Sequence, residues 1–263
     1  MHASGCFVLP NPWDVGTAVY LEHLGFQAIA TTSAGFAFSR ARPDGVLAVP
    51  RDTMLDHIRE MAAATTLPLN ADYQSGYADD PEGVAANVAL CVATGCAGLS
   101  IEDATGREGP PLYETGLAVE RVRAARAAID ASGVPVVLTA RCEAFLVGER
   151  DAHRVALARL TAFADAGADC LYAPGVTSPA EIAEIVRAVA PNPVNVLVSR
   201  PAPELTVAKL ADLGVRRISV GGALARVAWG AFIRAARSLL TTGTFDALAE
   251  GVPFDELNGV FRT

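Results

Sequence analysis

The stretch "LPLNADYQSGY" (residues 67–77) holds the pattern that decides the fold, a short apolar run that ends in polar residues. We predict a buried strand over residues 67–72, with Asn70 and Asp72 two positions apart and therefore on one face. A turn is one explanation, because Asn and Asp bond to nearby backbone groups and often end strands. A metal site is the other, and the rest of the chain is needed to choose between them.

The alternation of a short apolar run with a longer helical segment recurs from end to end of the chain. Predicted strands lie at residues 6–10, 27–32, 67–72, 97–102, 134–140, 169–174, 194–199 and 217–221. Predicted helices include 82–94, 180–190 and 205–213, and the glycines expected just after helices are Gly25, Gly95, Gly133, Gly167 and Gly214. This count predicts an α/β fold, a single (β/α)8 TIM-type barrel domain over residues 1–263. A doubly wound open sheet is the alternative, but no GxGxxG sequence follows the first strand.

An apolar helical segment follows the last predicted strand. Residues 223–263 include an amphipathic stretch, 245–261, whose apolar positions are Phe245, Leu248, Phe254, Leu257 and Phe261. Because an exposed apolar face of this kind requires a partner surface, we expect residues 223–263 to lie in an oligomer interface.

The composition narrows the class of partner. The chain has 263 residues, 51% of them hydrophobic, a net charge of −8 and scattered Lys and Arg, which argues against nucleic acid or an anionic membrane as partner. We therefore expect a small-molecule ligand. Five cysteines without CxxC spacing are expected to be reduced, and neither a leader sequence nor a membrane-length apolar run is present, so we expect a cytoplasmic protein.

Polar residues gather at the C-terminal ends of the predicted strands, where the active sites of such barrels lie. They are Asn11, Asp14, Thr32, Ser33, Asn70, Asp72, Glu102, Asp103, Arg141, Glu143, Ser199 and Arg200. Oxygen ligands without paired His or Cys favour Mg²⁺, with Mn²⁺ as an alternative, over Zn²⁺. Asp72 and Glu102 come from consecutive strands and are expected to share the ion. The four histidines lie in the N-terminal tail or in predicted helices, so we interpret them as surface residues.

Four stretches resemble the isocitrate lyase and phosphoenolpyruvate mutase superfamily. They are "TTSAGFAFSRARPDG" (31–45), "NADYQSGY" (70–77), "GLSIED" (98–103) and "ARCEAFLVG" (140–148), and the resemblance in order and spacing covers roughly residues 8–240. It implies a Mg²⁺-dependent (β/α)8 barrel that makes or breaks C–C or P–C bonds in 2-oxo or 2-hydroxy acids. It also implies a homodimer or homotetramer in which a C-terminal helix is exchanged between subunits.

The resemblance also implies roles for individual residues. It suggests substrate binding by Ser33, Ala34, Gly35, Asp44, Arg141 and Asn195, and catalytic roles for Asp44, Arg141 and Glu143. Asp72 is the expected nearest metal contact, Glu102 a ligand through water, and Asn70 stands where the family usually has a further aspartate. We expect Asn70 to remain in the outer shell of the metal, because an amide can accept a bond from a metal-bound water.

The segment after the fourth predicted strand departs from the family. It reads "IEDATGREGPPLYETG" (101–116), without the Lys-[Lys/Arg]-Cys-Gly-His loop of isocitrate and 2-methylisocitrate lyases and without the mutase loop. The sequence therefore resembles a divergent, 2-methylisocitrate lyase-like member. Arg107, Glu108 or Tyr113 either serve in a mobile lid over residues 104–116 or belong to a solvated loop.

We predict a Mg²⁺-dependent lyase or hydrolase that cleaves a C–C bond in a small 2-oxo or 2-hydroxy di- or tricarboxylic acid through a metal-stabilised enolate. One alternative is P–C bond chemistry on phosphonopyruvate-like substrates. A second is a 2-oxo acid binding protein with little catalysis. A third is a phosphate-binding barrel that uses "VGGAL" at residues 220–224.

Overall fold

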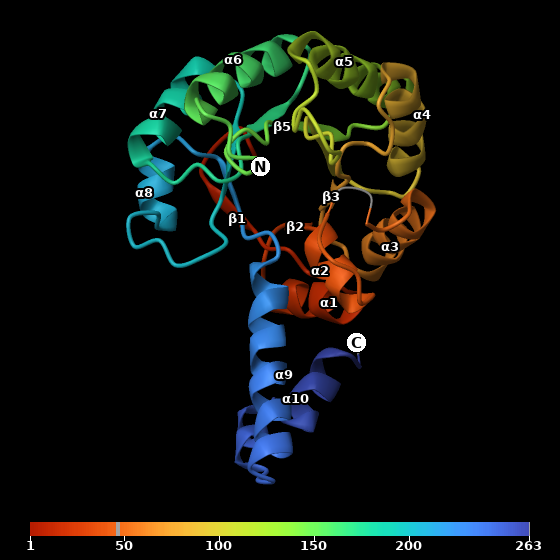
Figure 1. Cartoon of the computed structure of the whole chain (residues 1–263). Helices are drawn as coiled ribbons and strands as arrows, with labels where there is room; N and C mark the ends of the chain where they lie inside the picture. The colour runs from red at the N-terminus through yellow and green to blue at the C-terminus, as the bar shows by residue number, and fades with distance from the viewer. Residues whose placement is uncertain (46–47, 263) are drawn as a thin grey trace.

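Eight parallel strands form the inner wall of the molecule, which is a computed structural model describing residues 1–45 and 48–262 (Figure 1). The strands are β1 (Phe7–Leu9), β2 (Ile29–Ala30), β3 (Leu69–Asp72), β4 (Gly98–Glu102), β5 (Val137–Arg141), β6 (Cys170–Tyr172), β7 (Val194–Leu197) and β8 (Arg217–Ser219). Their order is β1-β8-β7-β6-β5-β4-β3-β2, and a hydrogen bond from Ala30 N to Pro10 O, 3.0 Å long, links the two ends. The predicted (β/α)8 barrel is confirmed.

Helices surround the strands on the outside of the barrel. They are α1 (Val15–His23), α2 (Ser33–Ser39), α3 (Arg51–Ala64), α4 (Pro81–Val92), α5 (Thr115–Ser132), α6 (Ala152–Asp165), α7 (Pro179–Ala188) and α8 (Val207–Asp212). The five glycines predicted to follow helices all have positive φ, between +68° and +98°, which only glycine adopts without strain. Side chains of Asp80, Ser178 and Thr206 cap the starts of α4, α7 and α8.

The alternation of side chains along β4 shows how the barrel separates its core from its site. Leu99 and Ile101 are buried in the main apolar cluster, which lies between the strands and the helices. Ser100 and Glu102, the alternate residues, line cavities on the inner side of the strands. The polar residues of the strands therefore converge inside the barrel, at its C-terminal end.

The last part of the chain leaves the barrel. Helix α9 (Ala223–Thr241) extends away from it, and η1 (Asp246–Glu250) and α10 (Phe254–Val260) fold back beside α9 (Figure 1). The hydroxyl of Tyr20 in α1 donates to Glu256 Oε1 at 2.7 Å and joins α10 to the barrel. The exposed apolar side chains of this segment include Val227, Trp229, Phe232, Ile233, Leu240, Phe245, Leu248 and Phe254.

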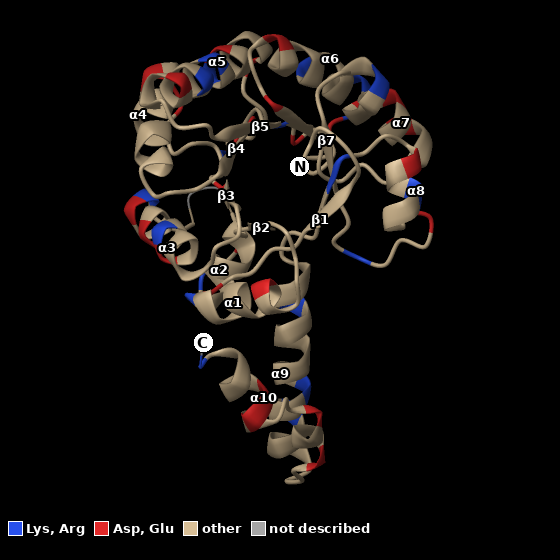
Figure 2. Ribbon diagram, turned by 180° about the vertical axis from the view of Figure 1, so that it is seen from behind, with Lys and Arg blue, Asp and Glu red and all other residues tan. Residues whose placement is uncertain are grey.

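Charged residues of both signs are mixed along the outer helices (Figure 2). Helix α3 carries the exposed ion pair between Arg59 and Asp56, and α5 carries that between Arg123 and Glu120. No helix in the described ranges has both the length and the apolar character needed to cross a bilayer.

The interpretation of His57 as a surface residue is wrong. Its side chain is 5% exposed, and its ring stacks on that of Phe36, with 3.7 Å between the ring centroids. Burial lowers the pKa of His57 to about 4, and the nearby Arg40 acts in the same direction. The sequence of α3 did not reveal this, because only the packing of α3 against α2 places the ring inside.

The burial of neutral His57 predicts a stability that depends on pH. An unfolded histidine has a pKa near ~6.5, so between pH ~6.5 and ~4 the unfolded chain binds the proton more readily than the folded one. The free energy of unfolding should therefore fall as the pH falls through this range, by up to about 3 kcal/mol from this residue. Urea unfolding of wild type and His57→Phe at several pH values measures it. Parallel curves for the two proteins would contradict the prediction.

Candidate active site

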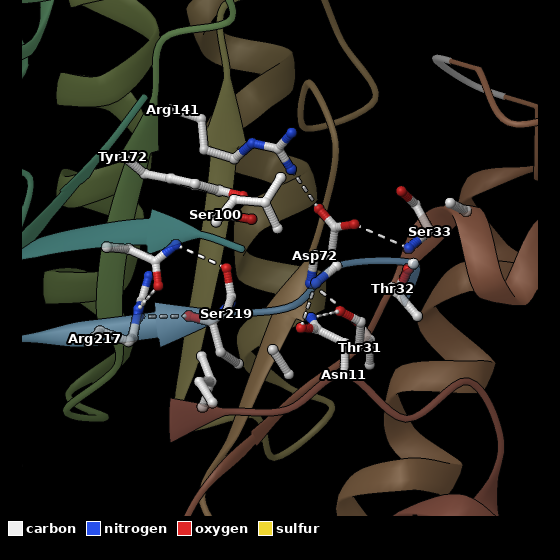
Figure 3. Close-up of a pocket in the computed structure, with 18 of the residues that line it drawn as sticks. Asn11, Thr31, Thr32, Ser33, Asp72, Ser100, Arg141, Tyr172, Arg217 and Ser219 are labelled. Atoms are coloured by element: carbon white, nitrogen blue, oxygen red, sulfur yellow. Dashed lines mark hydrogen bonds and ion pairs between the residues drawn. The ribbon is translucent and has the colours of Figure 1, made fainter. Parts of the chain in front are cut away.

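A cavity of about 170 Å³ lies at the C-terminal end of the barrel, where the sequence places the site (Figure 3). Its lining includes the following predicted residues: Asn11, Thr32, Ser33, Ala34, Asp44, Asn70, Asp72, Arg141 and Asn195. The lining does not include Ser199 or Arg200, which follow β7. Asp14 is also elsewhere, because its carboxylate caps α1 by accepting a bond from Thr17 N at 2.7 Å.

Asp72 is fixed from both sides at the end of β3. Its Oδ2 accepts a hydrogen bond from Ser33 N at 2.9 Å, and its Oδ1 accepts one from Arg141 Nη1 at 2.8 Å. Its own backbone N–H donates to Thr31 Oγ1 at 2.8 Å. The carboxylate therefore joins the start of α2 to the end of β5 across the cavity (Figure 3).

Arg141 binds three carboxylates. Besides Asp72, its Nη2 lies 3.2 Å from Glu102 and 2.8 Å from Glu143, and its Nε donates to Glu143 Oε1 at 2.9 Å. The strand register places Glu102 beside Arg141 and Arg141 beside Tyr172, whose ring centroid lies 5.1 Å from the guanidinium carbon. Predicted residues from β3, β4 and β5 thus meet at one cation.

This cluster holds more negative charge than Arg141 neutralises. Burial raises the pKa of Glu102 to about 8; Arg141 opposes the rise, and Glu143 and Asp72 add to it. Burial, with the charge of Asp72, also raises the pKa of Asp44. Burial alone would lower the pKa of Arg141, but its three carboxylate partners raise it well above the usual value. A second cation would relieve this excess of negative charge.

The residues fit Mg²⁺ in charge and in donor type. The described chain has no group of three or more His, Cys, Asp or Glu side chains set around a single ion position, and the Arg141 guanidinium lies among the carboxylates. Asp72 and Glu102 offer the oxygen donors that Mg²⁺ prefers, and Mg²⁺ commonly binds through only one or two carboxylates and several waters. These two residues would hold the ion by sharing their oxygens between it and Arg141.

Asn70 and Asn195 lie deeper in the barrel than the Arg141 cluster. Asn70 Oδ1 accepts a bond from Arg217 Nη1 at 3.4 Å, and Asn195 Oδ1 accepts one from Arg217 Nε at 2.9 Å. The structure gives Asn70 no hydrogen bond to Asp72, Glu102 or Arg141 among those described. Its place in the outer shell of a metal stays a prediction.

Sequence reasoning missed Arg217. The sequence did contain an indication of it, the arginine within the short strand-like run "RISVG" (217–221). A charged side chain is rarely buried in the apolar layer between strands and helices, so it is expected to face the inside of the barrel. Arg217 is 4% exposed and lines the cavity.

Gly35 shapes the start of α2 rather than the cavity wall. A Cβ at this position would lie 2.7 Å from Thr32 Cγ2 and 2.9 Å from Trp13 Cβ, so a larger residue would displace the helix. Its N–H donates to Thr32 Oγ1 at 3.2 Å, which caps α2. Gly35 thereby positions Ser33 and Ala34, which do line the cavity.

A second cavity of about 290 Å³ adjoins the first on the side of the loop after β4. Both are lined by Ser33, Asp44 and Arg141, and the second is also lined by Glu102 and Glu143. The loop is held to the one after β3: Arg107 pairs with Asp79, and the buried Tyr113 donates its hydroxyl to Asp79 Oδ1 at 2.6 Å. Of the three lid candidates, Arg107 lines this cavity and Glu108 is exposed to solvent.

Comparisons of the sequence identify relatives. A family model described as phosphoenolpyruvate phosphomutase matches residues 1–240. An uncharacterised protein of Mycobacterium tuberculosis (strain H37Rv) is 34% identical over 260 residues, which are 98% of this chain and 93% of that protein. The 2-methylisocitrate lyase of Escherichia coli K12 is 32% identical over 180 residues, which are 65% of this chain and 58% of that enzyme.

Several solved structures have a fold similar to that of this chain. A Burkholderia cenocepacia J2315 protein, described as a lyase/mutase, has a TM-score of 0.95 and 49% identity, covering 100% of this chain and 93% of its own. Oxaloacetate acetylhydrolase in complex with its product oxalate has a TM-score of 0.86 and 27% identity over 97% of this chain and 89% of its own. Phosphonopyruvate hydrolase with oxalate and Mg²⁺ has a TM-score of 0.83 and 25% identity over 97% and 90%.

Removing the shared cation should destabilise the protein strongly. In Arg141→Gln the carboxylates of Asp72, Glu102 and Glu143 lose their partner, and breaking a buried ion pair in this way costs about 3–5 kcal/mol. The loss should shrink at lower pH, where the unpaired carboxylates take up protons. Denaturant unfolding measures both effects. Arg59→Gln is the control, since its exposed pair with Asp56 is worth less than about 1 kcal/mol; equal losses in the two variants would refute the argument.

Proposed function

Because the chain belongs to the phosphoenolpyruvate mutase and isocitrate lyase superfamily, we propose that it is a Mg²⁺-dependent lyase or hydrolase that cleaves a C–C bond in a small 2-oxo or 2-hydroxy di- or tricarboxylic acid. The protein is an enzyme of the carbon–carbon lyase type found in that superfamily. The observation that carries the proposal is the cluster of Asp72, Glu102 and Glu143 on Arg141 at the barrel mouth.

The start of α2 is suited to bind the first carboxylate of the substrate. Ser33 and Ala34 line the cavity, and the Ser33 N–H donates to Asp72 Oδ2 at 2.9 Å. Arg141 lines the same cavity and adds positive charge. Holding the substrate by one end in this way orients the bond to be cleaved before the reaction begins.

Asp72 and Glu102 are the residues that would hold Mg²⁺. When bound, the ion polarises the 2-oxo group and lowers the energy of the negative charge that develops on its oxygen. The relatives support this assignment, since phosphonopyruvate hydrolase was solved with oxalate and Mg²⁺.

Asp44 and Glu143 are the proposed groups that move protons. Asp44 lines both cavities and its pKa is raised by burial, so it is suited to deliver a proton to the carbon freed by cleavage. Glu143 lines the second cavity, and its backbone N–H donates to Asp103 Oδ1 at 2.8 Å, which fixes its position. Neither role needs the cysteine loop that the sequence lacks.

P–C bond chemistry is the second candidate. The family model is that of a phosphomutase, and phosphonopyruvate hydrolase shares the fold at 25% identity. Release of inorganic phosphate from phosphonopyruvate would favour it over C–C cleavage.

A cytoplasmic location forms part of the proposal. All five cysteines are free, four of them are buried, and unpaired thiols are typical of proteins in a reducing compartment.

The C-terminal segment is the proposed oligomer interface. Phe232 and Leu240 on α9, the helix that extends away from the barrel (Figure 1), are 62% and 86% exposed. Large exposed apolar side chains that gather on one segment indicate an interaction surface. Exchange of this segment in a homodimer or homotetramer would cover them.

Disrupting that face should yield monomers. We expect light scattering to give a dimer or tetramer for wild type and a monomer for Phe232→Glu/Leu240→Glu. Val134→Glu is the control, because Val134 is an exposed apolar residue of the barrel itself and should leave the mass unchanged. A monomeric wild type would refute the interface.

Substrate turnover tests the proposed reaction. Oxaloacetate, 2-methylisocitrate, isocitrate and phosphonopyruvate are incubated with the enzyme and Mg²⁺, and products are followed by NMR. We expect cleavage of at least one carboxylic acid, abolished by EDTA and restored by Mg²⁺. Turnover of none of them would overturn the assignment.

Replacing Asp72 tests the metal site directly. Asp72→Ala should lower kcat by about a hundredfold or more and weaken Mg²⁺ binding, with the fold retained. Asp72→Asn keeps the size of the side chain but removes its charge, so it should show the same loss. Asp56→Asn, on the surface of α3, is the matched control. Unchanged Mg²⁺ affinity in Asp72→Ala would contradict the assignment.

A further inference from the structure

Arg217 lies inside the barrel, toward the start of β8, while Asp72 and Ser33 lie toward the C-terminal ends of the strands (Figure 3). Its Nε donates to Asn195 Oδ1 at 2.9 Å, its Nη2 to Thr139 Oγ1 at 2.8 Å and its Nη1 to Asn70 Oδ1 at 3.4 Å. All three acceptors are neutral. These bonds fix the direction of the guanidinium and leave its charge uncompensated.

Other buried arginines near the site have carboxylate partners. Arg141 has three, and Arg159 pairs with Asp103 at 3.0 Å. For Arg217, no carboxylate oxygen lies within ion-pair distance in the part of the chain that the structure describes. Burial of a guanidinium without an anion is costly, so its retention calls for an explanation.

The titratable groups around Arg217 do not supply that anion. Cys170 of β6 has its pKa raised by burial, so its thiol stays protonated at neutral pH. His2, near the opposite end of the barrel, has its pKa lowered to about 4 by burial and by the charge of Arg217, so it is neutral. The floor of the cavity is therefore positive, whereas the mouth is negative.

Arg217 faces the space in which the substrate is proposed to bind. It lines the 170 Å³ cavity together with Ser33, Asp72 and Arg141. Gly221, also in the lining, lies two residues beyond the C-terminal end of β8, whereas Arg217 is the first residue of that strand. The cavity thus runs from the barrel mouth to a buried cation, and a ligand that reached both would be elongated.

We propose that Arg217 binds the second carboxylate of an elongated 2-oxo dicarboxylate whose first carboxylate lies at Ser33. The inference rests on the proposed function. The carboxylate bound by Arg217 belongs to the end of the substrate that does not react. A carboxylate there would receive charge-assisted hydrogen bonds from a guanidinium already oriented by Asn195, Thr139 and Asn70. Arg217 would then be a specificity residue for substrate length and charge.

Asn70 contributes to the same proposed carboxylate-binding site. An aspartate at this position would place a carboxylate at 3.4 Å from Arg217 Nη1 and neutralise it. The amide has the same shape and accepts the same hydrogen bond without cancelling the charge. The departure from the family pattern at residue 70 therefore leaves Arg217 available to an anionic ligand.

A matched pair of ligands tests the proposal. Calorimetric titration with Mg²⁺ present compares 2-oxoadipate with 2-oxohexanoate, which differ only in the second carboxylate. Oxalate is too short to reach Arg217 and reports on binding at the mouth alone. For wild type we expect 2-oxoadipate to bind about tenfold tighter or more than 2-oxohexanoate. In Arg217→Met that preference should disappear, while 2-oxohexanoate and oxalate keep their affinities within about twofold.

Asn70→Asp is the second variant, because it keeps Arg217 and places a carboxylate at the position that accepts a hydrogen bond from Arg217 Nη1, while oxalate binding reports any effect on the metal. It should abolish the preference for 2-oxoadipate as Arg217→Met does. Arg217→Lys retains the charge and should preserve part of the preference. Melting temperatures confirm that each variant is folded.

The outcomes separate the two proposals. Equal wild-type affinities for the matched ligands, with oxalate still bound, would overturn the Arg217 subsite and leave the proposed function intact. Binding of neither 2-oxo acid nor oxalate would overturn the proposed function and this inference with it. Equal weakening of all three ligands in a folded Arg217→Met would assign the residue to barrel structure and also overturn the subsite.

Discussion

The ion pairs between Arg141 and the carboxylates of Asp72, Glu102 and Glu143 are the interaction on which the rest of the site depends. They cross-link β3, β4 and β5 at the barrel mouth, and through Asp72 they reach Ser33 N at the start of α2. These three carboxylates would repel one another without this cation. The barrel can therefore gather several acids in one place only because one arginine is buried among them.

Strand count and strand order followed from the sequence because they depend on local patterns. Short apolar runs, glycines after helices and polar residues at strand ends are each set by a few neighbouring residues, and the structure bears out their order. The resemblance to the superfamily drew on the same stretches. It also singled out Asp72, Glu102, Arg141 and Glu143, which the structure brings into one cluster.

Other features depend on contacts between distant elements and were not predictable in this way. His57 was expected on the surface, but the packing of α3 on α2 buries it against Phe36. Asp14 follows β1 like the site residues, yet it caps α1 because the helix begins at the next residue. Arg217 and Asn70 are 147 positions apart, so their hydrogen bond exists only through closure of the barrel.

Closure also explains why the two ends of the cavity differ in charge. The mouth collects acids that follow the strands, whereas the floor holds Arg217 among neutral amide and hydroxyl groups. A dicarboxylate entering without a cation would be repelled at the mouth and attracted at the floor. A divalent ion held by Asp72 and Glu102 would offset the negative charge at the mouth only, and so would permit both ends to bind at once. The proposed ion would then have a second role besides the chemistry, because it would hold the reactive end of the substrate at the mouth, beside Ser33 and Arg141.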